Sequence, residues 1–179
     1  MKVISVNIGQ PREARWRGRT VRSAIWKAAV AGPVRAGKLG LDGDVQADPA
    51  YHGGHEMAVY LYPAEHYAFW GPILGELPWG AFGENLTVEG LLEGDVHIGD
   101  ELRVGSALLE VTQPRTPCVK LAMRLQRPAI VREFTQSRRS GFYCAVREEG
   151  WVQTGDAVGW GERSRGMPTV SELLVNVKE

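Results

Sequence analysis

The residues best suited to chemistry lie in one short segment, Pro114–Leu121, where a cysteine stands among two prolines and two basic residues. The prolines restrict the backbone and so fix the direction in which the thiol of Cys118 points. Arg115 lies three residues before the cysteine and Lys120 lies two residues after it. Nearby positive charge favours the thiolate, which is the form that binds metals and attacks electrophiles. The segment therefore predicts a reactive or metal-binding cysteine; the alternative that the residues leave open is a buried structural one.

A second candidate is the segment Tyr51–Glu56, in which two glycines follow a histidine. Gly53 and Gly54 would let the backbone approach a ligand closely, and His52 would be able to exchange a proton. Zinc is disfavoured, because the helical zinc-peptidase motif spaces its histidines by four residues. Here His55 follows by three residues across a glycine pair. The alternative is a histidine that only occupies a turn.

A third candidate follows Gly83, where Glu84 and Asn85 stand at the start of a predicted strand. Glycine permits a turn at this point, and the turn would present both polar side chains to a cleft. We expect His52, Glu84 and Asn85 to face the same cleft as Cys118, with His52 or Glu84 supplying protons. The alternative is that these side chains cap separate turns on unrelated surfaces.

The chain that must position these residues reads as many short strands separated by turns. It contains 22 glycines and 10 prolines, which punctuate it at short intervals. Apolar or alternating runs predict strands at 1–8, 21–30, 34–41, 57–61, 84–88, 96–104, 107–112, 142–147 and 157–161. Helices are predicted from Pro63 to Trp70, where Gly71-Pro72 would stop the first, at 119–125 and at 128–136, with a weak helix or strand at 170–177.

Residues 10–20 are polar and carry four arginines, Arg12, Arg15, Arg17 and Arg19. We expect a solvated loop or hairpin tip here, and the alternative is a loop that faces an anion. One internal similarity also stands out, because residues 96–105 and 152–161 share the pattern apolar-x-x-Gly-Asp-x-apolar-x-apolar-Gly. A repeated unit of turn and strand is typical of a barrel or a sandwich.

Composition limits the function classes. The 179 residues suit one domain, and 44% of them are hydrophobic. Lys plus Arg and Asp plus Glu both number 21, whereas a nucleic-acid binder usually carries a basic excess. We therefore expect no nucleic-acid partner. No run approaches the roughly 20 apolar residues of a membrane span, and no secretion signal is visible, so a cytoplasmic protein without membrane contact is expected. Its two cysteines should then stay reduced, with Cys144 in the core.

Five short motifs occur along the chain, and their order is more informative than any one of them. They are 40–44 (Gly-Leu-Asp-Gly-Asp), 52–54 (His-Gly-Gly), 83–86 (Gly-Glu-Asn-Leu), 99–100 (Gly-Asp) and 114–121 (Pro-Arg-Thr-Pro-Cys-Val-Lys-Leu). With this series the chain resembles the MOSC domain family (molybdenum cofactor sulfurase C-terminal domain), and most closely its stand-alone YiiM-like branch. The resemblance is dense over residues 37–121 and thinner outside them.

The resemblance implies a mostly β, barrel-like fold with a few short helices in a single domain, residues 1–179. It implies binding of the molybdenum cofactor, a pterin (molybdopterin) whose dithiolene holds the metal. Cys118 matches the family's motif cysteine, which implies that it binds molybdenum or carries sulfur. The implied catalytic residues are Cys118, His52 and Glu84, and the implied cofactor-binding residues are Arg115, Lys120, Asn85, Gly53 and Gly54.

Relatives in this branch are linked to the reduction of N-hydroxylated bases such as 6-hydroxylaminopurine. This implies a molybdenum-dependent oxidoreductase with a small N-hydroxylated substrate and a flavoprotein electron donor. The chemistry agrees, since soft thiolates suit molybdenum and Arg115 or Lys120 could pair with the cofactor phosphate. The alternative function is a non-catalytic cofactor carrier or sulfur-relay protein, and a third is a fold used only for protein contacts.

Overall fold

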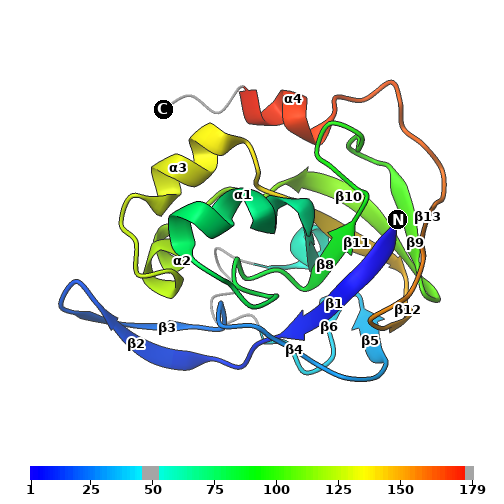
Figure 1. Cartoon of the computed structure of the whole chain (residues 1–179). Coiled ribbons are helices and arrows are strands. Elements are labelled where there is room, and N and C mark those ends of the chain that lie inside the picture. The colour runs from blue at the N-terminus through cyan, green and yellow to red at the C-terminus, as the bar shows by residue number, and fades with distance from the viewer. Residues whose placement is uncertain (46–52, 176–179) are drawn as a thin grey trace.

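The computed structural model describes residues 1–45 and 53–175 and is dominated by short strands (Figure 1). In chain order the strands are β1 (Lys2–Ile8), β2 (Arg12–Trp16), β3 (Arg19–Ser23), β4 (Ala28–Ala29), β5 (Val34–Gly37), β6 (Gly40–Leu41), β7 (Val59–Pro63), β8 (Leu86–Glu89), β9 (Glu101–Val104), β10 (Ala107–Pro114), β11 (Phe142–Glu148), β12 (Gly150–Val152) and β13 (Val158–Trp160). The helices are the 3₁₀ turn η1 (His55–Met57), α1 (Glu65–Leu74), α2 (Val119–Arg124), α3 (Ile130–Ser137) and α4 (Val170–Val175). The prediction of mostly β structure with a few short helices is confirmed.

Eight strands form the main sheet in the order β13-β9-β10-β11-β7-β8-β1-β4. All neighbours are antiparallel except β7 and β8, which run parallel with Leu61 opposite Leu86. Only an isolated bridge between Lys2 and Ala157 and a few backbone hydrogen bonds join β1 to the segment before β13. The sheet is therefore open in its strand order, and the predicted barrel is not closed by a continuous ladder.

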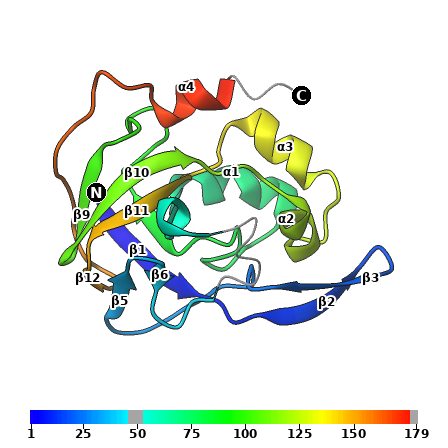
Figure 2. The same cartoon turned by 180° about the vertical axis from the view of Figure 1, so that it is seen from behind.

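Two hydrophobic clusters cover the faces of this sheet. The larger is aliphatic and includes residues of nearly every strand, with Cys144 fully buried in it, as the sequence predicts. The smaller is aromatic and lies between the sheet and the helices α1, α2 and α3, which pack on the same side (Figures 1 and 2). In it the ring of Phe134 stacks on those of Trp70 and Tyr62, with centroids 5.6 and 6.0 Å apart. This aromatic cluster supports the segments that carry the candidate functional residues.

Several local predictions are wrong. The strand predicted at 34–41 is two strands, β5 and β6, because the chain turns back at Gly40, whose φ is +136°. The strand predicted at 96–104 begins only at Glu101.

Two further differences also have physical causes. The strand predicted at 21–30 breaks after Ser23, because the Ser23 hydroxyl accepts a hydrogen bond from the Ile25 amide at 3.2 Å and the chain turns away from the ladder. The first helix continues through Pro72 to Leu74, since a proline removes only one donor near a helix end. It ends instead at Gly75, whose φ of +79° suits glycine. None of the described helices is long and apolar enough to cross a membrane.

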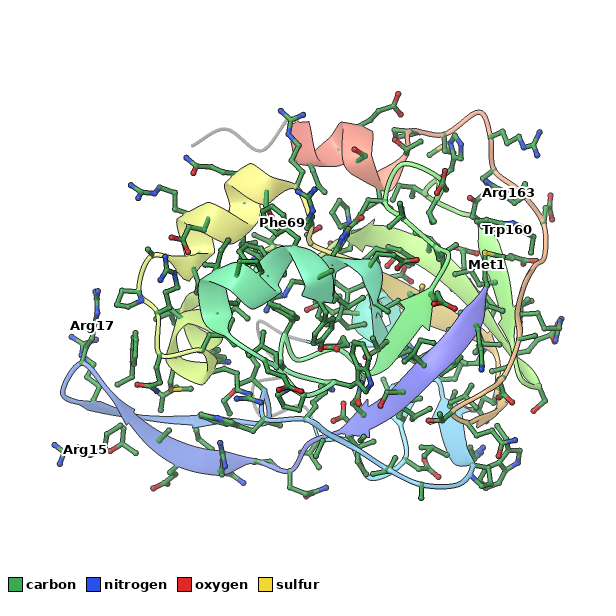
Figure 3. All side chains as sticks on the ribbon, viewed as in Figure 1. Met1, Arg15, Arg17, Phe69, Trp160 and Arg163 are labelled. Atoms are coloured by element: carbon green, nitrogen blue, oxygen red, sulfur yellow. The ribbon has the colours of Figure 1, made fainter. Side chains whose placement is uncertain are left out.

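The two segments with similar sequences, 96–105 and 152–161, also have similar structures. In each copy the aspartate carboxylate accepts a hydrogen bond from the amide three residues earlier, at 2.8 Å for His97 to Asp100 and 2.9 Å for Gln153 to Asp156. The two following strands, β9 and β13, then pair with each other. Asp100 also accepts the Ser164 amide at 2.7 Å and lies 3.1 Å from Nε of Arg163, whose guanidinium stacks on Trp160 (Figure 3).

Asp100 should therefore contribute more to stability than its counterpart. Burial acts to raise the pKa of Asp100, but the two amides and Arg163 hold it below its ordinary value of 3.8. Such a carboxylate stabilises the fold above that ordinary value, and the contribution is lost as the pH falls through the lower folded pKa. We expect Asp100→Asn to lower the free energy of unfolding by about 1.5–3 kcal/mol at pH 7, measured by urea denaturation.

Asp156→Asn is the matched control, because it changes the same turn position with fewer partners, and it should cost less than about 1 kcal/mol. The difference in the free energy of unfolding between wild type and Asp100→Asn should become smaller at acidic pH. Equal costs for the two variants, or a difference that does not change with pH, would contradict this account.

Candidate functional site

A cavity of about 110 Å³, partly open to solvent, lies beside the aromatic cluster. Its walls come from the segment between β3 and β4, the turn after β6, the strands β7 and β11, the turn before β8 and the start of α2. These segments are far apart in sequence, so the pairing of β7 with β8 and β11 is what assembles the cavity.

Cys118 contributes a free, partly exposed thiol to the cavity wall. Its backbone is extended, and its carbonyl accepts a hydrogen bond from the Leu121 amide at 2.9 Å as the helix α2 begins. The preceding segment is tied to the residue before β11, because the Arg115 amide donates to the carbonyl of Gly141 at 3.2 Å. The thiol is therefore held by backbone on both sides and is accessible from the cavity.

Arg115 lines the same cavity and is only 4% exposed. Its guanidinium lies 5.5 Å from the ring centre of Tyr60 and 5.3 Å from that of Phe134. Its Nη1 atom has no hydrogen-bond partner in the described part of the chain. A buried cationic nitrogen without a partner is costly, so an anionic group in the cavity would satisfy it. Burial raises the pKa of the neighbouring Tyr143, and Arg115 opposes that rise.

A buried ion pair lines another part of the wall. The ammonium of Lys27 contacts Asp44 Oδ2, and Asn85 Nδ2 donates to the same oxygen at 2.8 Å. The other carboxylate oxygen accepts the amide of Gly9 at 2.8 Å. Burial lowers the pKa of Lys27, while the charges of Asp44 and Glu84 oppose that shift. Asn85 is in turn fixed by β7, since its Oδ1 accepts the amide of Tyr60 at 3.1 Å.

Glu84 is fully buried and is not part of the cavity wall. Its carboxylate accepts hydrogen bonds from the hydroxyls of Tyr67 and Thr87 and from the amides of Gly80 and Phe82. Burial raises the pKa of Glu84, and these donors oppose that rise in part. The carboxylate therefore holds the turn before β8, and it is the backbone of this turn that places Asn85 in the wall.

The structure brings together most, though not all, of the residues predicted to form the site. Gly53, Asn85, Arg115 and Lys120 line the cavity with Cys118. Gly54, with a φ of +83°, begins the turn η1 instead. His52 lies outside the described residues, so its predicted position in the cleft stays a prediction.

Lys27 is a residue that sequence reasoning missed, and the signal for it was weak. It is a single lysine between Trp26 and Ala28, in a stretch predicted as a strand. A lysine in an apolar run indicates burial only if a carboxylate partner exists, and that partner, Asp44, lies 17 residues away. In the sequence, Asp44 appeared only as part of the motif at 40–44, with no partner assigned to it.

Comparison with known proteins places this geometry in a family. Residues 48–159 match the MOSC domain. The chain is 44% identical over 154 residues to the uncharacterized protein YflK of Bacillus subtilis, covering 86% of this chain and 70% of YflK. It is 36% identical over 153 residues to a protein of Gibberella moniliformis named Reductase, covering 82% of this chain and 27% of that protein.

A solved structure is also similar over nearly the whole chain. The crystal structure of YiiM from Geobacillus stearothermophilus superimposes with a TM-score of 0.80 and 36% identity, covering 97% of this chain and 81% of that one. The match to the family spans more than half of the sequence and includes the segment of Cys118. The chain therefore belongs to the MOSC domain family and is YiiM-like.

Proposed function

We propose that the cavity binds the molybdenum cofactor through the thiolate of Cys118 and supports the two-electron reduction of small N-hydroxylated compounds. The observation that carries this proposal is the pairing, in one cavity, of an accessible thiol with a buried guanidinium that has no anionic partner among the described residues. A ligand that contains a soft metal and carries negative charge would bind the thiolate through the metal and pair with the guanidinium through its charge. The name Reductase for the relative from Gibberella moniliformis agrees with this chemistry.

The residues present fit such a cofactor. In the described part of the chain no group of three or more His, Cys, Asp or Glu side chains is placed to hold a metal ion. A metal at Cys118 would thus take its other ligands from the cofactor, and a dithiolene supplies sulfur ligands. Arg115 would pair with an anionic part of the cofactor. Asn85 and the backbone at Gly53 would lie against the pterin, because both line the cavity. When bound, the cofactor would supply the two electrons.

The chain itself must supply protons, because R–NHOH plus two electrons and two protons gives R–NH₂ and water. Lys27 is a candidate donor, since its ammonium borders the cavity and burial favours release of its proton. Asp44 and Asn85 hold Lys27 in place. His52, predicted from the sequence, is the other candidate. Glu84 would act by positioning the turn, because all its described hydrogen bonds are to groups inside the protein.

A carrier or sulfur-relay protein is the second candidate function, and the partial exposure of the Cys118 thiol favours it. The two functions share cofactor binding and differ in turnover. Reduction of 6-hydroxylaminopurine by the purified, cofactor-loaded protein with a chemical electron donor separates them. Metal and pterin analysis of the purified protein tests the binding that both require.

Cys118→Ser should abolish molybdenum retention and leave the fold intact, because the partly exposed side chain supplies the ligand and little packing. Metal content by mass spectrometry and the thermal unfolding midpoint are the measurements. Cys144→Ser is the control and should retain the metal, since Cys144 is buried in the aliphatic cluster, away from the cavity wall. A Cys118→Ser protein with full molybdenum content would refute the assignment.

Arg115→Ala should weaken cofactor binding by about 1.5–3 kcal/mol, as expected for the loss of a charge-assisted hydrogen bond. Arg139→Ala is a matched control, because Arg139 also stacks on an aromatic ring, Phe69, at 4.0 Å, but is not part of the cavity wall. Equilibrium dialysis against molybdopterin gives the affinities. Equal affinities for the two variants would remove Arg115 from the binding site.

Turnover should fall as the pH rises through the lowered pKa of Lys27, below the ordinary lysine value of 10.5, because the neutral amine has no proton to donate. Lys27→Met should lower kcat and remove this alkaline limb while molybdenum content stays unchanged. Lys38→Met serves as control, since Lys38 donates to the carbonyls of Val146 and Arg147 outside the cavity. A pH profile that Lys27→Met leaves unaltered would assign the proton to another group.

A further inference from the structure

The strands β2 and β3 form a hairpin that stands apart from the rest of the fold. Among the described strands they pair only with each other, as a two-stranded sheet, with Glu13 opposite Arg22 and Arg15 opposite Thr20. Figures 1 and 2 show this hairpin extending along one edge of the molecule, with its turn far from the main sheet. The turn itself is tight, with φ of +48° at Arg17 and +79° at Gly18. The predicted loop or hairpin tip at 10–20 is confirmed only for the turn at 17–18, because residues 12–16 and 19–20 are paired strand.

The two faces of the hairpin differ in character, because side chains alternate along a strand. One face carries Ala14, Trp16 and Val21, which are half-buried, and Trp16 packs against the aromatic cluster. This contact fixes the hairpin on the body of the protein. The other face carries Glu13, Arg15, Thr20 and Arg22, all of them exposed. The hairpin is therefore a supported arm with one face turned to solvent.

The exposed charge of this arm is strongly positive. It carries five exposed arginines, Arg12, Arg15, Arg17, Arg19 and Arg22, and one acidic residue, Glu13. Among the ion pairs of the described residues none involves these arginines. Arg12 stacks on Trp26 at 4.0 Å, and Figure 3 shows Arg15 and Arg17 at the outer end of the hairpin, pointing away from the body. In a chain of zero net charge this is a local concentration of unpaired cations.

The arm is also connected directly to the cavity. Strand β3 ends at Ser23, and Ser23, Ala24 and Ile25 line the cavity wall. A partner that binds the arm would thus lie next to the cavity in which the proposed reduction takes place. Charge complementarity of this kind raises association rates, and small, charged interfaces are typical of transient redox encounters.

We propose that the hairpin β2–β3 is the docking surface for an acidic electron-transfer protein. This inference rests on the proposed reductase function, which consumes two electrons in each turnover. With a flavodoxin hydroquinone as donor, two molecules would each give one electron, and R–NHOH with two protons would become R–NH₂ and water. Nucleic acid is disfavoured as the occupant, because the outward face offers no aromatic side chain on which bases could stack.

The test compares two charge-reversal variants of the cofactor-loaded protein. Arg15→Glu/Arg22→Glu reverses the outward face of the hairpin, and Arg132→Glu/Arg165→Glu makes the same change of charge at exposed arginines elsewhere. Reduced flavodoxin of net negative charge is the protein donor, and reduced benzyl viologen is the small donor. Flavodoxin binding is measured separately by biolayer interferometry at 50 and 300 mM salt.

The hairpin variant should show a KM for flavodoxin and a Kd for flavodoxin raised at least about tenfold, while viologen-driven turnover stays unchanged. Wild-type binding should weaken with salt, and the control variant should behave as wild type. Equal flavodoxin binding by the two variants would overturn the docking surface, as would a wild type that prefers single-stranded DNA. No viologen-driven reduction by wild type would instead refute the reductase function, and the binding measurement would still decide the surface.

Discussion

The buried carboxylate of Glu84 is the interaction on which the arrangement of the cavity depends. It collects four hydrogen-bond donors, from the helix α1, the turn at 80–82 and the strand β8. Through the Thr87 hydroxyl, which also accepts from Asn7 Nδ2 at 3.1 Å, the network reaches β1. Because a buried carboxylate without donors would be costly, these elements are held together as a unit. The turn that carries Asn85 is thus held by a carboxylate that does not itself line the cavity.

The charged side chains around the cavity do not neutralise one another completely, and the remaining positive charge indicates an anionic ligand. Lys27 and Asp44 neutralise one another, with Asn85 completing the hydrogen bonds of the carboxylate. Arg115 lies against aromatic rings and is hydrogen-bonded to Tyr143, but its Nη1 atom has no hydrogen-bond partner among the described residues. In a low-dielectric site a positive charge of this kind acts strongly on a ligand that enters, and Lys120 adds a second basic side chain to the cavity wall. An anionic, polarisable ligand would pair with this charge and also bind the thiol of Cys118.

Much of the fold and of the site could be predicted because the signals were local. The hairpin of β9 and β10, the helices α2 and α3, and the thiol segment each follow from turn residues, prolines and apolar spacing within about ten positions. Lys27 and the inward direction of Glu84 could not be predicted in this way. Their roles depend on Asp44 and Tyr67, which are each 17 residues away along the chain. The break after Ser23 also escaped prediction, because a hydroxyl there competes with the ladder for the amide.

Net charge is a weak guide to partners when the charges are segregated, and this chain illustrates why. Its balance of 21 basic and 21 acidic residues argues against a protein that binds along the phosphate backbone of a nucleic acid. It says nothing about a local field, because potentials of exposed charges fall off within about 10 Å at ordinary salt. The acidic residues that balance the sum pair elsewhere, as Glu110 with Arg147 and Glu149 with Arg35. The arginines of the hairpin outnumber its one acidic residue, Glu13, and form no ion pair among the described residues, so this surface is locally positive although the whole protein is neutral.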